Sequence, residues 1–407
     1  MALAGCGAMG VPEETVAENL PTAENDDETW EEEKRFRTEL EKVKRIANPK
    51  QDPASWSIKG LATKVDLKAL IRFGQTNDTM PRLVSPETTP FRKHYISGRK
   101  LAVIKNAHRK LNPARYQIAA LVEEFRNEYF CLDDNHDAML QFGDFVQYMK
   151  NTQDDDPLMI FDCDFENRYS VAHKRKGRLS EYAVPDIFAG DSLFSLVECR
   201  PPWRWLIVAP KRSGTEMHVD PLGTCAWNTL LEGLKLWAIL PVEAGKHYNL
   251  ESECNMWAAL WFIEVGMAAA KLPEDNRPTF VLQRPGETIF VPAGRYHVVL
   301  NLTDTVAITE NFASEFHFDD ILRVTVKKEP EFCEKFFQRL REERNDLAER
   351  AMDLCSKESK HILQKWAKAN LDCKKDLCHT ADVKSTPGIN RQATVDDDSE
   401  DSGFDLL

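Results

Sequence analysis

The chain has 407 residues, of which 42% are hydrophobic and 29% charged, so it can build a large core and is not disordered throughout. Its formal net charge of −13 argues against a dedicated nucleic-acid-binding protein, because such proteins usually carry a basic face. Contact with nucleic acid is therefore expected to be weak or indirect.

The sequence predicts no secretory signal and no membrane segment. The longest apolar run, 256–272, is interrupted by Glu264 and is too short to cross a bilayer comfortably. The 10 cysteines show no framework spacing, which favours reduced thiols in a nuclear or cytoplasmic protein.

The first 150 residues are expected to form two regions. Residues 1–50 are acidic and poor in apolar residues, which predicts a disordered tail, with a solvated helix as the alternative. Residues 51–150 are expected to be mixed and largely helical, because apolar residues recur at helical spacing over 119–129 and 142–149.

A domain over residues 151–328 is expected to be mostly β. The run 158–161 is a first strand candidate, and from residue 203 short apolar runs alternate with turn signals such as Glu232-Gly233. Many short strands with regular turns predict a jelly-roll sandwich or barrel. An insertion over 242–278, partly helical around 256–270, interrupts this pattern. The expected strands are 205–209, 224–231, 236–240, 279–282, 288–291, 297–302 and 305–312.

Residues 329–372 return to a helical period. Cys333, Phe336, Phe337 and Leu340 line one side of the predicted helix. This stripe fits a helix docked on the sheet as well as a helix pair that dimerises, so a homodimer through the C-terminal helices is a hypothesis. The acidic segment 373–407 is expected to be disordered.

His218 and Asp220 form a candidate metal site with His297. Two positions apart on a strand, His218 and Asp220 point to the same face. His297 opens another apolar run much later in the chain. A His-x-Asp pair alone occurs by chance, but two histidines and one carboxylate are the ligands of non-haem Fe(II) oxygenases. Zinc prefers four tetrahedral ligands, so iron fits better.

Lys235 lies in an apolar run and shares a strand face with Trp237 and Ile239. A buried ammonium needs an anionic partner, although the side chain could instead reach solvent at the strand end. Beside an iron site, the far carboxylate of 2-oxoglutarate would be a natural partner. Asn228 and Thr309 add polar groups to faces otherwise expected to be core; they indicate a pocket, or else buried polar groups satisfied within the fold.

Several segments resemble the JmjC oxygenases, most closely the bifunctional arginine demethylase and lysyl-hydroxylase group. The resemblance covers residues 116–328 densely. The segments that carry it most clearly are His218-Val219-Asp220-Pro221-Leu222-Gly223-Thr224, Ala226-Trp227-Asn228, Pro285-Gly286-Glu287-Thr288 and Ile308-Thr309-Glu310-Asn311-Phe312.

The resemblance implies a JmjC double-stranded β-helix with N-terminal helices and a C-terminal helical segment. It implies Fe(II), with 2-oxoglutarate and O2 as co-substrates. The implied roles are metal ligands for His218, Asp220 and His297, 2-oxoglutarate binding for Asn228, Lys235 and Thr309, and substrate contact for Thr215.

The resemblance also implies a nuclear enzyme that hydroxylates lysines of histones and RNA-splicing proteins, substrates rich in Lys and Arg, and that demethylates methyl-arginine as a second activity. Basic clusters at 173–176 and 327–328 fit a nuclear protein, although such clusters are more often solvated loops. Met159 stands where the family has a tyrosine, and Arg295 and Tyr296 where it has two tryptophans; these differences bear on substrate choice.

Two alternatives belong to other classes. One is a non-catalytic interaction protein with the same fold and a vestigial metal site, against which the intact ligand set and Lys235 argue. The other is a metal enzyme that uses no 2-oxoglutarate, which would not need Lys235. Succinate formation in the presence of Fe(II) and 2-oxoglutarate distinguishes both from the implied enzyme.

Overall fold

The computed structural model describes residues 23–358, except for 108–111, 133–136, 168, 171–174, 177–178, 180–181, 191, 199 and 243–246. The chain divides after Arg344 into two compact units. Helix α12 (Asn345–Glu358) is the described part of the second unit, and the other described helices and all the described strands belong to the first.

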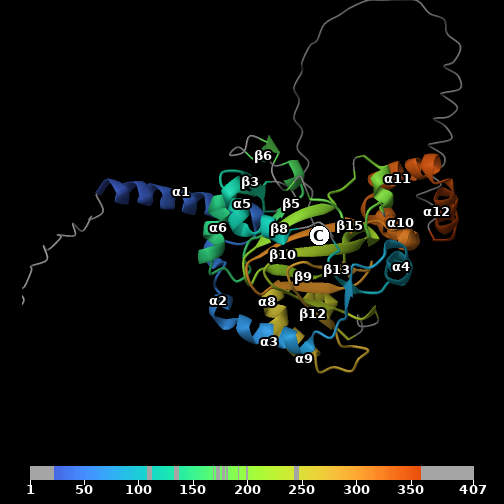
Figure 1. Cartoon of the computed structure of the whole chain (residues 1–407), viewed down its shortest axis with the longest axis horizontal. Helices are drawn as coiled ribbons and strands as arrows, with labels where there is room; N and C mark the ends of the chain where they lie inside the picture. The colour runs from blue at the N-terminus through green and yellow to red at the C-terminus, as the bar shows by residue number, and fades with distance from the viewer. Residues whose placement is uncertain are drawn as a thin grey trace, which may run out of the picture. The chain divides into compact units, whose positions relative to one another are not determined.

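Two β-sheets form the centre of the first unit (Figure 1). One has seven strands in the order β1-β2-β13-β10-β15-β8-β5, the other four in the order β12-β11-β14-β9. The strands of the larger sheet are β1 (Arg82–Val84), β2 (Ala102–Lys105), β5 (Ile160–Asp162), β8 (Arg204–Ala209), β10 (Cys225–Glu232), β13 (Glu287–Val291) and β15 (Thr305–Phe312). Those of the smaller sheet are β9 (Gly214–His218), β11 (Lys235–Ile239), β12 (Thr279–Gln283) and β14 (His297–Asn301).

Apolar side chains fill the space between the two sheets. They come from β2, β10 and β13 on one side and from β11, β12 and β14 on the other: Val103, Ala226, Trp237, Ile239, Val281, Ile289, Val291 and Val299. The opposite face of β10 is also buried, because Trp227 and Leu231 pack in a second core with the surrounding helices. Burial on both faces explains why these strands are continuous apolar runs in the sequence.

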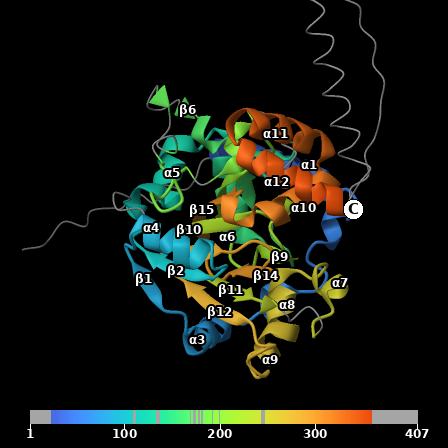
Figure 2. The same cartoon turned by 90° about the vertical axis from the view of Figure 1, so that its right-hand side faces the viewer.

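This arrangement is the predicted jelly roll. Each strand expected between residues 205 and 312 is present, and its ends differ from the expected ones by at most one residue. The insertion over 242–278 is partly helical, as expected, with α7 (Leu250–Glu253), α8 (Ala258–Trp261), η9 (Phe262–Gly266) and α9 (Met267–Ala269). In Figure 2, α3, α8 and α9 lie on the side of the smaller sheet, where α3 contacts β12 and α8 contacts β9 and β14.

The N-terminal region is largely helical, as predicted. Asp66 caps α3 by accepting a hydrogen bond from the Ala69 N–H at 2.9 Å. This region also supplies β1 and β2 to the larger sheet. Its other elements are η1 (Pro53–Ser55), α2 (Leu61–Lys64), α3 (Leu67–Asn77), α4 (Thr88–Phe91), η2 (Arg92–Ile96), η3 (Pro113–Tyr116), α5 (Ile118–Phe125) and α6 (Phe142–Asn151), with the strand pair β3 (Tyr129–Cys131) and β4 (Met139–Gln141).

The expectation of a disordered tail over residues 1–50 is wrong for Ala23–Ala47, which form the helix α1. Phe36 and Val43 on this helix are buried in the second core, the one that contains Trp227. The Lys44 ammonium lies 2.6 Å from the Asp154 carboxylate in a buried ion pair. The apolar positions are spaced by seven residues within a mostly charged stretch, so low average hydrophobicity concealed a helix with one buried face. Residues 1–22 lie outside the described residues.

The short elements between β5 and β8 are η4 (Phe165–Asn167), the pair β6 (Tyr169–Ser170) and β7 (Arg175–Lys176), and η6 (Leu193–Leu196). Beyond β9, η7 (Pro221–Gly223) leads into β10, and η10 (Glu315–His317) follows β15. None of the described helices is long and apolar enough to span a bilayer.

Two helices, α10 (Phe318–Lys328) and α11 (Pro330–Glu343), follow the sheets and pack on each other. The predicted apolar stripe on α11 is buried. Phe194 of η6 packs edge-to-face against Phe332 and Phe336, with ring centroids 4.9 and 5.2 Å away. This stripe therefore packs within the first unit. Of its two interpretations, the docked helix agrees with this packing. Dimerisation through these helices stays a hypothesis, and the segment 373–407 lies outside the described residues.

Candidate active site

The strands β9 and β14 bring the three predicted metal ligands together. They pair antiparallel with His218 opposite His297, and their imidazole centroids are 4.2 Å apart. A Cβ atom at Gly214 would lie 2.1 Å from the Val299 carbonyl oxygen, so this pairing requires glycine. One potential ligand atom each of His218, Asp220 and His297 lies within 4.8 Å of the others. This spacing suits a single metal ion held on one side by three ligands.

Backbone carbonyls orient both imidazoles. His218 Nδ1 lies 2.7 Å from the Glu216 carbonyl oxygen, and His297 Nδ1 lies 2.9 Å from that of Arg295. When each Nδ1–H donates to its carbonyl, each Nε2 keeps a free lone pair for the metal. This pattern fixes the tautomer that a metal ligand needs.

Burial sets the protonation of the three ligands. It lowers the pKa of His218 to about 4, helped by the neighbouring His297, and it lowers the pKa of His297 to about 4. Burial also raises the pKa of Asp220 to about 6, against the opposing effects of His218 and a hydrogen bond from Asn311. Near neutral pH both imidazoles are therefore neutral and the carboxylate is ionised, which is the form that binds a divalent metal.

The affinity for a divalent metal should fall as the pH drops below about 6. Metal binding must then displace a proton from Asp220, at a cost of up to about tenfold in affinity per pH unit. Below about pH 4 the two imidazoles add to this loss. Titration of the protein with Mn(II) across this range measures the effect, and an affinity that stays constant between about pH 7 and pH 5 would contradict it.

A cavity of about 460 Å³ lies beside the three ligands, between the two sheets. All the site residues predicted from the sequence line it: Thr215, His218, Asp220, Asn228, Lys235, His297 and Thr309. They come from β9, β10, β11, β14 and β15 and from the turn after β9, so the jelly roll gathers them from distant parts of the chain.

Lys235 opens β11 and is 3% exposed. It lines the cavity, and no hydrogen bond or ion pair of its ammonium is found among the described residues. Burial lowers the pKa of Lys235 to about 7. The alternative in which this side chain reaches solvent is therefore wrong. A buried ammonium without a counter-ion is costly, so the cavity is built to receive an anion.

Asn228 and Thr309 face each other across the β10–β15 pair. The Thr309 hydroxyl donates a hydrogen bond to the Trp227 carbonyl at 2.9 Å, which fixes its rotamer and leaves its oxygen as an acceptor. Asn228 Oδ1 lies 3.4 Å from Gln283 Nε2. Both side chains are thus held at the cavity wall by their neighbours.

Gln283, which was not predicted as a site residue, supports this wall. Its Oε1 accepts a hydrogen bond from Trp237 Nε1 at 2.8 Å, and its Nε2 donates to the carbonyls of Asn228 and Glu287 at 3.0 Å each. Asn301 was missed as well; it donates to Ser213 Oγ at 3.0 Å and lines the cavity. Both are single polar residues at strand ends, a position that gives no sequence signal.

The variant Gln283→Leu should lower the free energy of unfolding by about 3 kcal/mol, because it leaves buried donors and acceptors of Trp237, Asn228 and Glu287 without partners. It should also weaken 2-oxoglutarate binding, since Asn228 loses its support. Chemical denaturation and co-substrate titration measure the two effects. The control variant Gln75→Leu, at an exposed position on α3, should change neither property; equal losses in the two variants would contradict this assignment.

The residues that differ from the family pattern fall into two groups. Met159 lines the cavity. Arg295 does not line it and donates to the Leu240 carbonyl at 3.3 Å, and Tyr296 packs against the core beneath the smaller sheet. Of these differences, Met159 therefore has the most direct access to a substrate.

Comparison with known proteins agrees with this geometry. A model of the JmjC domain, described as a hydroxylase, matches residues 205–312. The chain is 32% identical over 330 residues to the bifunctional arginine demethylase and lysyl-hydroxylase psr-1 of Caenorhabditis briggsae, which covers 75% of this chain and 78% of that protein. The chain belongs to the JmjC-domain hydroxylases.

Two further relatives share parts of this JmjC chain. It is 36% identical over 252 residues to the protein of the same name from Caenorhabditis elegans, a match that covers 58% of this chain and 60% of the relative. It is 33% identical over 134 residues to a Drosophila melanogaster protein named 2-oxoglutarate and iron-dependent oxygenase JMJD4 homolog, covering 32% of this chain and 30% of that protein. The family consists of dioxygenases that use Fe(II), 2-oxoglutarate and O2.

The residues present fit these groups. When bound, Fe(II) with 2-oxoglutarate and O2 supplies the oxidising power for C–H hydroxylation. His218, Asp220 and His297 would hold the metal from one side and leave positions open for the co-substrates. Lys235 would pair with the far carboxylate of 2-oxoglutarate, and the surrounding apolar side chains exclude water and strengthen that ion pair.

Proposed function

We propose that this JmjC enzyme hydroxylates lysine side chains of Lys- and Arg-rich nuclear proteins such as histones and RNA-splicing factors, and that it demethylates methyl-arginine as a second activity. The observation that carries the proposal is one cavity that joins the metal ligands to the buried ammonium of Lys235. The names of the Caenorhabditis relatives support this choice of reactions.

The charge at the active-site cavity favours a cationic substrate. Glu216 lines the cavity next to His218, and no ion pair with a lysine or arginine is found for it within the described ranges. Met159 and Phe161 line the same cavity. They could contact the methylene chain of a lysine or arginine, while Glu216 could pair with the cation at its end.

Both proposed reactions use the same step at different bonds. Insertion of one oxygen atom from O2 into a C–H bond of a lysine methylene group gives hydroxylysine. Insertion into the N-methyl group of methyl-arginine gives a carbinolamine, which releases formaldehyde and leaves the demethylated nitrogen. In each case 2-oxoglutarate is oxidised to succinate and CO2 and takes up the second oxygen atom.

We also propose a nuclear location and a homodimer formed through the C-terminal helices. The adjacent lysines 327 and 328 are exposed in the last turn of α10 and are available to a nuclear import receptor. For the dimer, the supporting observation is Met352 on α12, an apolar side chain that is exposed in the single chain.

Mass spectrometry of peptides incubated with the enzyme, Fe(II) and 2-oxoglutarate tests the reactions. A lysine peptide should become one oxygen atom heavier, and a matched peptide with methyl-arginine should become one methylene group lighter. The variant Asp220→Ala is the control and should give neither product. Succinate formation without any peptide product would reject the proposed substrates, and no succinate at all would favour the non-catalytic alternative.

A further inference from the structure

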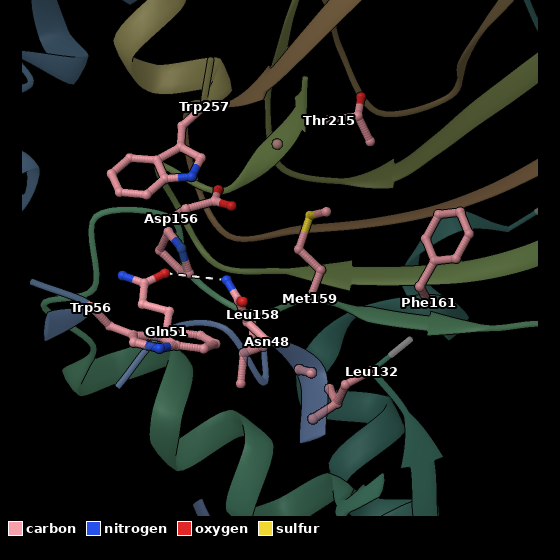
Figure 3. Close-up of a pocket in the computed structure, with 13 residues that line it drawn as sticks. Asn48, Gln51, Trp56, Leu132, Asp156, Leu158, Met159, Phe161, Thr215 and Trp257 are labelled. Carbon is pink, nitrogen blue, oxygen red and sulfur yellow. Dashed lines mark hydrogen bonds between the residues drawn. The ribbon is translucent and has the colours of Figure 1, made fainter. Parts of the chain in front are cut away.

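A second cavity of about 400 Å³ adjoins the active-site cavity (Figure 3). The two share part of their wall: Met159, Phe161, Gly214 and Thr215 line both. A chain that places one side chain at the metal can therefore place a neighbouring side chain in the second cavity, because consecutive residues are separated by only about 3.3–3.6 Å.

Two tryptophans and one aspartate give the second cavity its chemical character. Trp56 follows η1, Asp156 lies between α6 and β5, and Trp257 precedes α8, so three distant segments contribute to it. In Figure 3 the side chains of Asp156 and Trp257 are drawn on one side of the cavity and that of Phe161 on the other, and all three line it. Aromatic surface next to a carboxylate is the combination that binds a guanidinium or an ammonium group.

Asp156 differs from the two aspartates that precede it. Asp154 is paired with Lys44 at 2.6 Å and accepts a hydrogen bond from the Tyr148 hydroxyl at 2.7 Å. Asp155 accepts hydrogen bonds from the backbone N–H groups of Lys59 and Leu61, at 2.7 and 2.6 Å. Asp154 and Asp155 therefore anchor this segment in the fold, and none of these contacts uses Asp156.

For Asp156, no hydrogen bond or ion pair is found in the part of the chain that the structure describes. Burial raises the pKa of Asp156 to about 7, and the negative charges of Glu216 and Asp154 raise it further in the same direction. Its carboxylate is therefore held among other carboxylates with no cation to offset it, and binding of a cation would relieve that repulsion.

The tryptophans of this wall already accept cations from the protein itself. Lys44 Nζ lies 5.0 Å from the centroid of the Trp56 ring, and the exposed Lys59 has its Nζ 4.3 Å from that of Trp257. Neither lysine forms an ion pair with Asp156 among the residues described. The site therefore combines cation-binding rings with a carboxylate that has no ion pair among the side chains the structure describes.

We propose that the second cavity is a substrate subsite that binds the guanidinium of an arginine flanking the target residue, with Asp156 as its counter-ion and Trp257 as its aromatic wall. The inference rests on the proposed function insofar as it assumes a peptide substrate whose target side chain reaches the metal. It narrows the substrate class to peptides with an arginine within about three residues of the target, the reach that the shared wall allows.

Paired peptides test this subsite through binding and turnover. Each pair contains one target lysine and differs in a single flanking residue, arginine or its neutral isostere citrulline. Binding is measured by fluorescence anisotropy on the full chain loaded with Mn(II) and 2-oxoglutarate, and turnover by mass spectrometry with Fe(II). The proteins compared are the wild type, Asp156→Asn and the control Asp275→Asn, which removes the same charge from an exposed position outside both cavities.

The wild type and Asp275→Asn should bind the arginine peptide about 5- to 30-fold more tightly than the citrulline peptide, and Asp156→Asn should bind both equally. The charge-reversed variant Asp156→Lys should instead prefer a peptide with glutamate at that position, a gain that misfolding cannot produce. An arginine preference that persists in Asp156→Asn, or that is absent from the wild type at every flanking position, would overturn the inference. If the binding preference holds but no oxygen is added, the subsite stands and the proposed reaction is wrong.

Discussion

Replacing Lys235 with methionine is expected to weaken 2-oxoglutarate binding by about 10²- to 10³-fold. The ammonium is buried in the cavity and is the counter-ion available to the far carboxylate of the co-substrate. Removing one member of a buried ion pair typically costs about 3–5 kcal/mol, of which part is recovered here because methionine fills the same volume. Titration of the Mn(II)-loaded protein with 2-oxoglutarate measures the change.

The same substitution should stabilise the protein when no co-substrate is bound. Burial lowers the pKa of Lys235 to about 7, from an ordinary value near 10.5. Near pH 7 the unfolded chain therefore binds more protons than the folded chain, and Lys235 costs on the order of 4 kcal/mol of folding free energy. This cost is largest below pH 7 and disappears as the pH rises through 7 toward about 10.5.

Two measurements separate this account from a general packing effect. The wild type should gain stability between about pH 7 and pH 10 relative to Lys235→Met, because only the wild type carries the buried amine. The exposed Lys211 supplies the control Lys211→Met, which should change neither stability nor 2-oxoglutarate affinity. A Lys235→Met protein that binds 2-oxoglutarate normally would refute the role given to Lys235.

The variant His297→Ala is expected to abolish turnover and to weaken metal binding by about 10³-fold or more. His297 supplies one of the three ligand atoms within 4.8 Å of one another, and two remaining ligands hold a divalent ion poorly in water. Its ring also lies 5.9 Å from that of Trp237, so alanine leaves a small space in the wall. Mn(II) titration and metal analysis of the purified protein measure the loss.

A matched variant distinguishes ligand loss from misfolding. His94 is exposed and lies outside the active-site cavity, so His94→Ala should retain metal and activity. The melting temperature of His297→Ala without metal should stay within a few degrees of the wild type, since a single neutral imidazole is removed. Full metal occupancy in a folded His297→Ala protein would contradict the ligand assignment.

The site residues that could be predicted from the sequence each stand out within their own segment, by their spacing or by their contrast with apolar neighbours. His218 and Asp220 are spaced for one face of a strand, and Lys235 interrupts an otherwise apolar run. His297 was found because it opens a strand, although its distance from the pair is set only when β9 and β14 align. The strands themselves were visible because burial on both faces makes them continuous apolar runs.

The residues that the sequence did not reveal depend on contacts between distant segments. Gln283 matters because its amide reaches Trp237 and Asn228, and Asp156 because it lines the same cavity as Trp257. Helix α1 was mistaken for a tail because a few apolar residues, Phe36 and Val43 among them, suffice to bury one face of a charged helix. In each case the role of the residue or helix depends on a contact with a distant segment, which local composition does not reveal.

Succinate formation is the most direct test of the claim that one cavity holds the metal and 2-oxoglutarate together. The wild-type protein with Fe(II), 2-oxoglutarate and O2 should release succinate, and removal of Fe(II) with a chelator should stop it. At limiting 2-oxoglutarate, His297→Ala and Lys235→Met should both be inactive, and only Lys235→Met should recover activity as the co-substrate concentration rises. A folded, iron-loaded wild-type protein that releases no succinate, or a Lys235→Met variant that works normally at limiting 2-oxoglutarate, would contradict the claim.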